Sequence, residues 1–282
     1  MTTEKTGTLY IVATPIGNLQ DITLRAVEVL KSVDRIAAED TRHSMPLLKH
    51  LAINKPALSM HEFNEQQRLG VLLDYLFEGE SIALISDAGT PLISDPGYRL
   101  VNAARAEGIK VVPIPGPCAA IAALSATGLP TDRFSFEGFL PARDEARANK
   151  LTELLHESRT MIFYEAPHRL LSSLQTMAQV FGENRIAAVA REMTKIHESI
   201  MTDSLSSIIS HYEANATEQR GEIVILVSGV DEKKSESREV VPEQVLSLLL
   251  EELPLKQAVT LASKITGERK NVLYDLALEK KG

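Results

Sequence analysis

Residues 86–97, Ser-Asp-Ala-Gly-Thr-Pro-Leu-Ile-Ser-Asp-Pro-Gly, combine small polar side chains with two turn signals, a composition that suits ligand binding. The apolar run 81–85 directly before them predicts a buried strand. Pro96 keeps Asp95 out of the helical region, and Gly97 permits a positive φ. In open α/β sheets, ligands bind in loops at the carboxyl ends of strands. The segment therefore predicts a binding loop, although one such loop can equally be an ordinary strand-to-helix turn.

Ionisable side chains gather in three further segments, each directly after a predicted strand. They are Asp40-Thr41-Arg42-His43-Ser44, Glu165-Ala166-Pro167-His168-Arg169 and Arg191-Glu192-Met193-Thr194-Lys195. Such groups can transfer protons, and a buried lysine beside another cation can be neutral enough to act as a base. They can equally bind phosphate groups. A solvated loop is an equally good interpretation of residues 40–44.

Short apolar runs predict the strands that must position these loops. In the first part of the chain, the expected strands are 8–13, 35–39, 81–85 and 111–114. Helices alternate with these strands, and the expected ones are a helix capped by Asp21, then 62–80, 98–107 and 119–125. This alternation predicts a parallel sheet.

The second part of the chain repeats the pattern of strands that end in polar motifs. The expected strands are 134–139, 160–164, 185–190 and 221–227, with a helix at 170–181. Residues 141–150 are polar and predict a loop or the start of a helix. The fold class is therefore α/β, with a second α/β segment after the first.

A small helical tail follows a charged linker at residues 231–240. Its expected helices are 242–253, 255–266 and 268–280. Residues 255–282 carry a charge of +3, so the remainder of the chain carries −11. The helix–Gly267–helix pattern suggests a nucleic-acid-binding module, and a packing appendage is an equally good interpretation. We therefore divide the chain into domains 1–118 and 119–230 and a linker with its tail at 231–282.

Composition excludes several other classes of protein. The chain has 282 residues, of which 44% are hydrophobic and 24% charged, enough to bury two cores. Its net charge of −8 requires any nucleic-acid binding to use a local basic surface. Cys118 is the single cysteine, which fits a reducing cytoplasm, and the scattered histidines predict no metal site. No apolar run approaches the length of a membrane span or a signal region.

Six motifs in order resemble the tetrapyrrole methylase-like superfamily, the class III S-adenosylmethionine methyltransferases. They are Thr14-Pro15-Ile16-Gly17-Asn18-Leu19, Glu39-Asp40-Thr41-Arg42, the segment 86–97, Pro115-Gly116-Pro117, and the two motifs that begin at Tyr164 and Arg191. Within this superfamily the chain resembles the bacterial branch that methylates cytidine 2′-hydroxyls in small-subunit (16S) ribosomal RNA. Tetrapyrrole methylases usually have Gly-Asp-Pro where this chain has Gly89-Thr90-Pro91. They also favour a Gly-rich first loop, and the first loop of this chain departs from that pattern. Both departures agree with the RNA-modifying branch.

The resemblance implies two α/β domains with the cofactor in the cleft between them. It also implies an S-adenosylmethionine-dependent enzyme that forms a homodimer and acts on the decoding region of small-subunit ribosomal RNA, which agrees with the cytoplasmic location that the composition predicts. By position, the implied cofactor contacts are Pro15, Asp87, Ala88, Gly89, Thr90, Ile93, Cys118, Ala119, Ala120, Tyr164, Glu192, Gly221 and Ile223. The catalytic candidates are Glu165, Arg191 and Lys195, with His168 and Arg169 beside them. Each of these side chains can instead hold RNA phosphates or support the fold.

Two other functions stay open at this point. The same cofactor site can methylate a small tetrapyrrole, or the chain can be an RNA-binding module that holds the cofactor without turnover. Neither the modified nucleotide nor the general base follows from the sequence.

Overall fold

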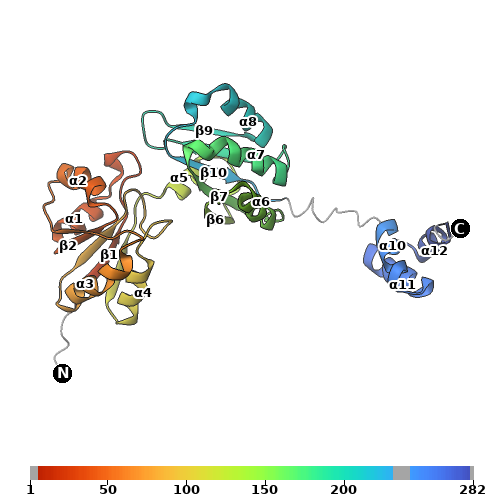
Figure 1. Cartoon of the computed structure of the whole chain (residues 1–282), viewed down its shortest axis with the longest axis horizontal. Coiled ribbons are helices and arrows are strands. Elements are labelled where there is room, and N and C mark those ends of the chain that lie inside the picture. The colour runs from red at the N-terminus through yellow and green to blue at the C-terminus, as the bar shows by residue number, and fades with distance from the viewer. Residues whose placement is uncertain (1–5, 231–241, 280–282) are drawn as a thin grey trace. The chain divides into compact units, whose positions relative to one another are not determined.

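The computed structural model describes residues 6–230 and 242–279, which belong to two units, 1–228 and 229–282 (Figure 1). The larger unit contains two five-stranded sheets, and the described part of the smaller unit, residues 242–279, contains three helices. This architecture confirms the predicted fold class. The predicted linker at 231–240 lies outside the described residues.

The first sheet is entirely parallel, as the alternation of strands and helices predicts. It orders its strands β3-β2-β4-β1-β5, and these are β1 Thr8–Val12, β2 Arg35–Ala38, β3 Ala57–Ser59, β4 Ile82–Ile85 and β5 Lys110–Ile114. Helices α1 (Leu24–Ser32) and α2 (Thr41–His50) contribute Leu30 and Leu48 to the core on one face. Helices α3 (Glu65–Phe77) and α4 (Tyr98–Ala106) contribute Leu72 and Leu100 on the other. Because both faces are covered, β4 is buried at all four positions.

Four details of this sheet and its helices differ from the sequence predictions. Residues 41–44 are the first turn of α2, whose N-cap Asp40 accepts a hydrogen bond from the Arg42 amide at 2.8 Å. Thr23, and not Asp21, caps α1, since its hydroxyl accepts from the Ala26 amide at 3.1 Å. The short strand β3 was not predicted, and the helix predicted at 62–80 is shorter at both ends.

The second sheet is mixed and orders its strands β6-β7-β10-β8-β9. Its strands are β6 Phe134–Phe139, β7 Thr160–Glu165, β8 Ile186–Arg191, β9 Ser199–Ser204 and β10 Ile223–Val227, and β6 and β7 form its parallel pair. Helices α6 (Asp144–Glu153), α7 (Leu170–Phe181) and α8 (Leu205–Ala214) pack against one face. Helix α5 (Ala119–Ala126) packs against the other face, where Ile16 from the loop after β1 joins the same core.

The sequence predictions missed β9 and α8 and left α6 undecided. Strand β9 is Ser-Ile-Met-Thr-Asp-Ser at the edge of its sheet, and none of its residues is fully buried. An edge strand with polar residues lacks the apolar run by which the central strands are recognised.

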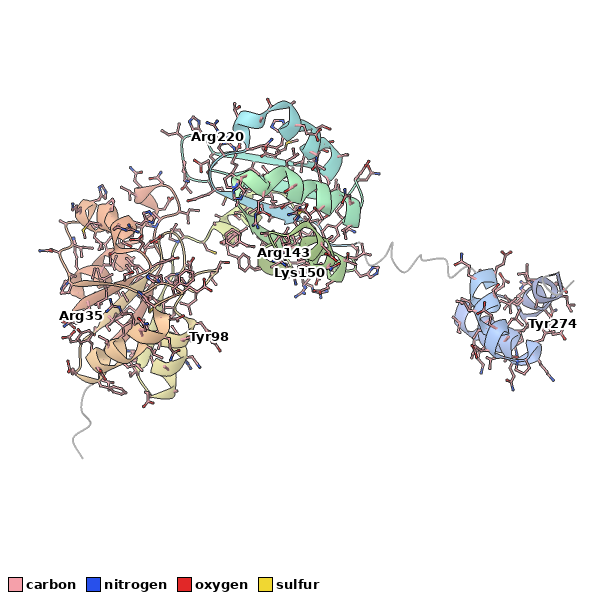
Figure 2. All side chains as sticks on the ribbon, in the orientation of Figure 1. Arg35, Tyr98, Arg143, Lys150, Arg220 and Tyr274 are labelled. Atoms are coloured by element: carbon pink, nitrogen blue, oxygen red, sulfur yellow. The ribbon has the colours of Figure 1, made fainter. Side chains whose placement is uncertain are left out.

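Helices α10 (Pro242–Glu252), α11 (Leu255–Thr266) and α12 (Lys270–Glu279) form the smaller unit, as the tail pattern predicts. They enclose a core of Leu246, Ala258, Val259, Ala262, Leu273 and Ala277. Gly267 ends α11 in the left-handed region at φ 73°, a conformation that glycine adopts readily. Tyr274 on α12 is 43% exposed and extends away from this core (Figure 2). The packed core shows that the tail folds around its own apolar residues.

Candidate active site

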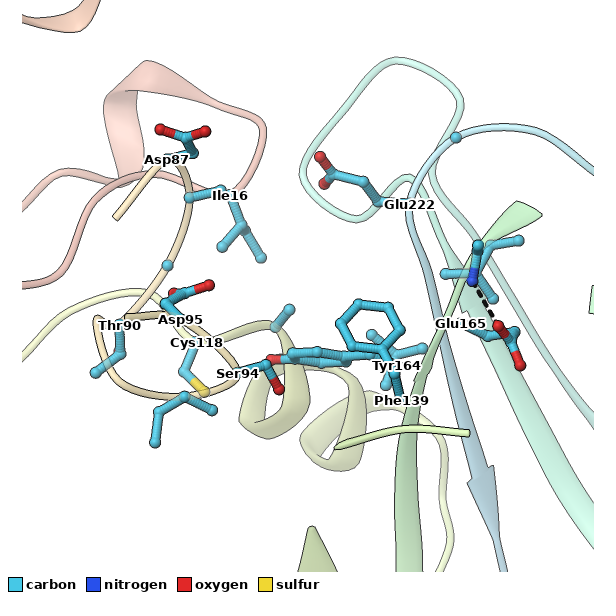
Figure 3. Close-up of a pocket in the computed structure, with 18 of the residues that line it drawn as sticks. Ile16, Asp87, Thr90, Ser94, Asp95, Cys118, Phe139, Tyr164, Glu165 and Glu222 are labelled. Atoms are coloured by element: carbon cyan, nitrogen blue, oxygen red, sulfur yellow. Dashed lines mark hydrogen bonds between the residues drawn. The ribbon is translucent and has the colours of Figure 1, made fainter. Parts of the chain in front are cut away.

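A cavity of about 410 Å³ lies where the carboxyl ends of β1, β2 and β4 face the second sheet (Figure 3). One side is lined by residues that follow these three strands, namely Ile16, Glu39, residues 87–90 and residues 93–95. The other side is lined by Phe139, residues 164–167 and residues 221–224. At the start of α5, the cavity is lined by Cys118 and Ala119. Its volume falls within the range of about 300–1,000 Å³ that is typical of small-molecule sites.

The loop 86–97 is fixed to its neighbours by backbone hydrogen bonds. Gly89 donates to the Thr14 carbonyl at 3.0 Å and accepts from the Thr14 amide at 2.8 Å. The Thr90 hydroxyl donates to the Pro117 carbonyl at 2.9 Å. Leu92 and Ser94 adopt φ values of 72° and 70°, which side-chain-bearing residues rarely adopt. The loop therefore presents a defined surface to the cavity.

Tyr164 forms an uncharged wall of the cavity. Its hydroxyl accepts a hydrogen bond from the Ala120 amide at 3.3 Å, in the first turn of α5. Its ring makes edge contacts with Phe136 and Phe139, at centroid distances of 4.9 and 5.7 Å. Burial raises the pKa of Tyr164 to about 12, so the hydroxyl keeps its proton at neutral pH.

Three carboxyl groups, from Glu39, Asp87 and Asp95, line the side of the cavity opposite Tyr164. Asp87 accepts from the Asp40 amide at 3.1 Å and pairs with the His43 imidazole at 2.8 Å, which raises the pKa of His43. Burial raises the pKa of Glu39, whose carboxylate also accepts from the Asp87 amide at 3.4 Å. Burial and then the charge of Glu39 raise the pKa of Asp95 to about 7. This acidic side favours a ligand that carries positive charge.

Glu165 lines the cavity, but its carboxylate is held by its own domain. It pairs with the Arg169 guanidinium and accepts hydrogen bonds from the Ser173 hydroxyl and the Ala166 amide, the last marked in Figure 3. Its side chain is fully buried. These contacts tie the end of β7 to the start of α7 and occupy both carboxylate oxygens.

The segment 191–195 lies behind the cavity wall. Lys195 pairs with Glu192 at 2.8 Å and with Glu222 at 3.2 Å. Burial opposes the charge of Lys195, but the two carboxylates outweigh it and raise the pKa above its usual value. The Arg191 guanidinium donates to the Ser199 hydroxyl at 3.3 Å, on the neighbouring strand β9. Lys195 is therefore a charged partner of the segment 221–222.

Two glycines permit close approach around this segment. A Cβ on Gly17 would lie 2.6 Å from Lys195 Cγ, so the loop after β1 packs directly against the segment 191–195. A Cβ on Gly221 would lie 2.2 Å from Glu192 Oε1. Side-chain-bearing residues at either position would displace these neighbours.

Most of the residues expected at the site do line the cavity. They are Asp87, Ala88, Gly89, Thr90, Ile93, Cys118, Ala119, Tyr164, Glu165, Gly221 and Ile223. The expected residues outside the lining are Pro15, Ala120, Arg191, Glu192 and Lys195. Lining residues that sequence reasoning did not assign to the site include Ile16, Glu39, Ser94, Asp95, Phe139 and Glu222. The second turn signal at residues 94–97 was the available clue to Ser94 and Asp95.

Within residues 6–230 and 242–279, no group of histidine, cysteine, aspartate and glutamate side chains is arranged to hold a metal ion. No helix in the same described ranges has the length and apolar character to cross a membrane.

Comparison with known proteins gives matches over nearly the whole chain. Residues 8–209 match the family model described as Tetrapyrrole (Corrin/Porphyrin) Methylases, and residues 237–281 match the one described as RsmI C-terminal HTH domain. The chain is 54% identical over 277 residues to "Ribosomal RNA small subunit methyltransferase I" from Pseudomonas aeruginosa, with 98% of each chain covered. The protein of the same name from Escherichia coli O157:H7 is 52% identical over 278 residues, which cover 98% of this chain and 96% of that one.

Solved structures with low sequence identity share the fold. Diphthine synthase superposes with a TM-score of 0.64 at 14% identity, covering 79% of this chain and 90% of that chain. A uroporphyrin-III-C-methyltransferase from Thermus thermophilus superposes with a TM-score of 0.55 at 19% identity, covering 82% and 98%.

Proposed function

This chain belongs to the family of tetrapyrrole methylases, and we propose that it methylates RNA of the small ribosomal subunit with S-adenosylmethionine as the methyl donor. The reaction that we propose is methyl transfer to the 2′-hydroxyl of a cytidine ribose in the decoding region. The sequence motifs, and the relatives that align with this chain over nearly their full length, support this assignment over the tetrapyrrole alternative.

The observation that carries the proposal is the extent of the match. Two relatives named for small-subunit ribosomal RNA align along 98% of this chain, including the helical tail. The match to the tetrapyrrole methylase model ends at residue 209, before the tail begins. A unit with its own core and an exposed Tyr274 suits a large substrate better than a small ring compound.

The cavity fits S-adenosylmethionine in size and in the chemistry of its lining. Small residues, among them Ala88, Gly89 and Ala119, leave backbone groups accessible to the polar edges of an adenosine. The carboxyl groups of Asp87 and Asp95 favour the positive charges of the methionine part. When bound, the cofactor supplies an electrophilic methyl group on its sulfonium. We assign the cofactor contacts to the residues predicted from the sequence that line this cavity, together with Ile16 and Ser94.

The protein's part in the reaction is to align the ribose hydroxyl with that methyl group and to accept the proton of the hydroxyl. Alignment alone contributes a large share of the rate in such displacements. We propose that Glu165 and Lys195, whose charges are paired within their domain, position the cavity wall. Arg191 is proposed to support the same wall through its hydrogen bond to Ser199.

We also propose that the protein is cytoplasmic and works as a homodimer, because the resemblance implies both. Two copies would widen the surface offered to a large RNA. Light scattering at micromolar concentration tests the dimer, and a monomer mass would contradict it.

The function is tested with purified protein, labelled S-adenosylmethionine and small subunits from cells that lack this modification. Digestion of the RNA to nucleosides followed by mass spectrometry is expected to give 2′-O-methylcytidine. A parallel reaction with an anionic tetrapyrrole tests the alternative substrate. Product from the tetrapyrrole and none from the subunits would refute the RNA assignment. Binding to subunits should weaken steeply as salt increases.

A further inference from the structure

Asp95 differs from the other carboxylates of the cavity in its partners. Asp87 pairs with His43, Glu165 with Arg169, and Glu222 with Lys195. The Glu39 carboxylate accepts from the Asp87 amide. Within residues 6–230 and 242–279, the hydrogen-bond partner of the Asp95 carboxyl group is the Ser86 hydroxyl. Asp95 is thus the cavity carboxylate that has neither a basic side chain nor a backbone amide to hold it.

The position of Asp95 is fixed by the backbone around it. Ser94 before it has φ 70°, Pro96 after it restricts its conformation, and the amide of Gly97 donates to the buried Glu65 carboxylate at 3.2 Å. Figure 3 shows the Asp95 side chain extending into the cavity from this loop, with Tyr164 on the opposite wall. A carboxylate that is held in place but lacks a strong partner is available to a bound substrate.

The charged and titratable groups near Asp95 come from its own loop after β4 and from β2, α2, β7 and α5. Glu39 follows β2, and Asp87 follows β4 with His43 of α2 beyond it. Tyr164 lies on β7, and Cys118 precedes α5. The nearest of these charges are negative, and Tyr164 stays neutral at pH 7. Asp95 therefore lies in an environment that favours binding a proton.

We propose that Asp95 is the general base that accepts the proton of the substrate hydroxyl during methyl transfer. The inference rests on the proposed function, which supplies a ribose 2′-hydroxyl as the nucleophile. The hydroxyl oxygen forms a bond to the methyl carbon, and the bond between that carbon and sulfur breaks with its electron pair going to sulfur. The hydroxyl proton goes to the Asp95 carboxylate, which releases it to solvent after the product leaves. Charge and atoms balance without another reactant.

The protonation behaviour of Asp95 suits this role. Burial and Glu39 raise its pKa from 3.8 to about 7, near the pH at which a general base is most effective. A bound sulfonium adds a positive charge that favours the ionised carboxylate. The donor itself would thus convert Asp95 to its basic form, whereas the neutral thioether product would not.

The first test measures proton release without turnover. Titration calorimetry at pH 7 in buffers of different ionisation enthalpy counts the protons released when S-adenosylmethionine or S-adenosylhomocysteine binds. We expect the wild type to release more protons with the methionine form, and Asp95→Asn to abolish this difference. Equal release by the wild type and by Asp95→Asn would show that Asp95 does not sense the sulfonium and would overturn the proposal.

The second test measures single-turnover methylation of small subunits at saturating cofactor. Asp95→Asn is expected to lower the rate by about 10²–10⁴-fold, the usual contribution of a general base. The affinity for S-adenosylhomocysteine should stay within about twofold, which also shows that the variant is folded. The wild-type rate should rise with pH and level off below about 7, because the bound sulfonium lowers the pKa of Asp95, and Asp95→Asn should lose this dependence. Asp95→Glu should recover part of the rate.

Asp74→Asn provides a matched control, since this exposed aspartate lies on α3 away from the cavity and should leave the rate unchanged. A wild-type rate in Asp95→Asn would overturn the assignment. Loss of S-adenosylmethionine affinity alone, with the rate at saturation intact, would do so too and would make Asp95 a charge partner of the cofactor. A wild type that releases protons through Asp95 but does not methylate subunits would refute the proposed function instead.

Discussion

Replacing Gly221 with alanine tests how the second sheet shapes the cavity wall. Gly221 has φ 86°, and a Cβ there would lie 2.2 Å from Glu192 Oε1. That oxygen accepts hydrogen bonds from Lys195 Nζ at 2.8 Å and from the Glu222 amide at 2.9 Å. The new methyl group must therefore displace a carboxylate that holds two partners.

The expected cost has two parts. The left-handed backbone costs a residue with a Cβ about 1–2 kcal/mol. Hydrogen bonds to charged groups contribute about 1.5–3 kcal/mol each, and partial exposure of Glu192 and Lys195 lowers the loss to about 2–3 kcal/mol for the pair. Gly108→Ala isolates the first part, because Gly108 has φ 72° and no atom within 4 Å of its Cβ position.

Urea unfolding followed by circular dichroism compares the two variants. We expect Gly221→Ala to be less stable than Gly108→Ala by about 2–3 kcal/mol. Calorimetry should also show weaker cofactor binding for Gly221→Ala alone, since Gly221 and Glu222 line the cavity. A double-mutant cycle should find that Glu192→Ala costs much less in the Gly221→Ala background. Equal stability of the two alanine variants would refute the reasoning.

Three further predictions concern the cofactor loop, the pH dependence of stability and the tail. Gly89→Val should abolish S-adenosylmethionine binding in a folded protein, because Gly89 lines the cavity at φ 82°; wild-type affinity by calorimetry would contradict this. The raised pKa of Asp95 means that the folded state keeps a proton which the unfolded chain loses between pH 3.8 and about 7, so stability falls as pH rises through this window. Asp95→Asn should therefore gain melting temperature over wild type from pH 4 to pH 8, and a constant difference in thermal melts would contradict the assignment. Deletion of residues 242–282 should leave cofactor affinity nearly unchanged but weaken subunit binding and methylation, and charge reversal at Lys264, Arg269 and Lys270 should do so more mildly. An unchanged dependence of methylation rate on subunit concentration in the charge-reversed protein would exclude an RNA-binding role for these three residues.

Local patterns were enough to locate the central strands and the loop 86–97, which lines the cavity. Strand β4 is an uninterrupted apolar run because it is covered on both faces, and the small residues after it mark the loop directly. The tail helices were equally plain, since Pro254 and Gly267 separate three amphipathic segments that share one core. The edge strand β9 was missed because its side chains are partly or fully exposed, so burial imposes no apolar pattern on them.

The roles of individual ionisable residues depended on contacts between distant segments. Glu165 was a reasonable catalytic candidate from its place at the end of a strand, yet Arg169 and Ser173 hold its buried carboxylate within the domain. Lys195 could have been a neutral base, but Glu192 and Glu222 keep it charged. For both residues, ion-pair partners that the fold brings close determine where the side chain is held.

The sequence by itself determined the central strands of the two sheets, the place of the loop 86–97 and the family that the chain resembles, because these depend on local periodicity and on motif order. Only the tertiary structure decided that Asp95 lies near Glu39 and Asp87 on the side of the cavity opposite Tyr164. The physical reason is that burial and charge set a pKa, and both come from residues far away in the chain. A short motif can predict an aspartate at the end of a strand, but the pKa of that aspartate depends on the groups that the fold brings near it.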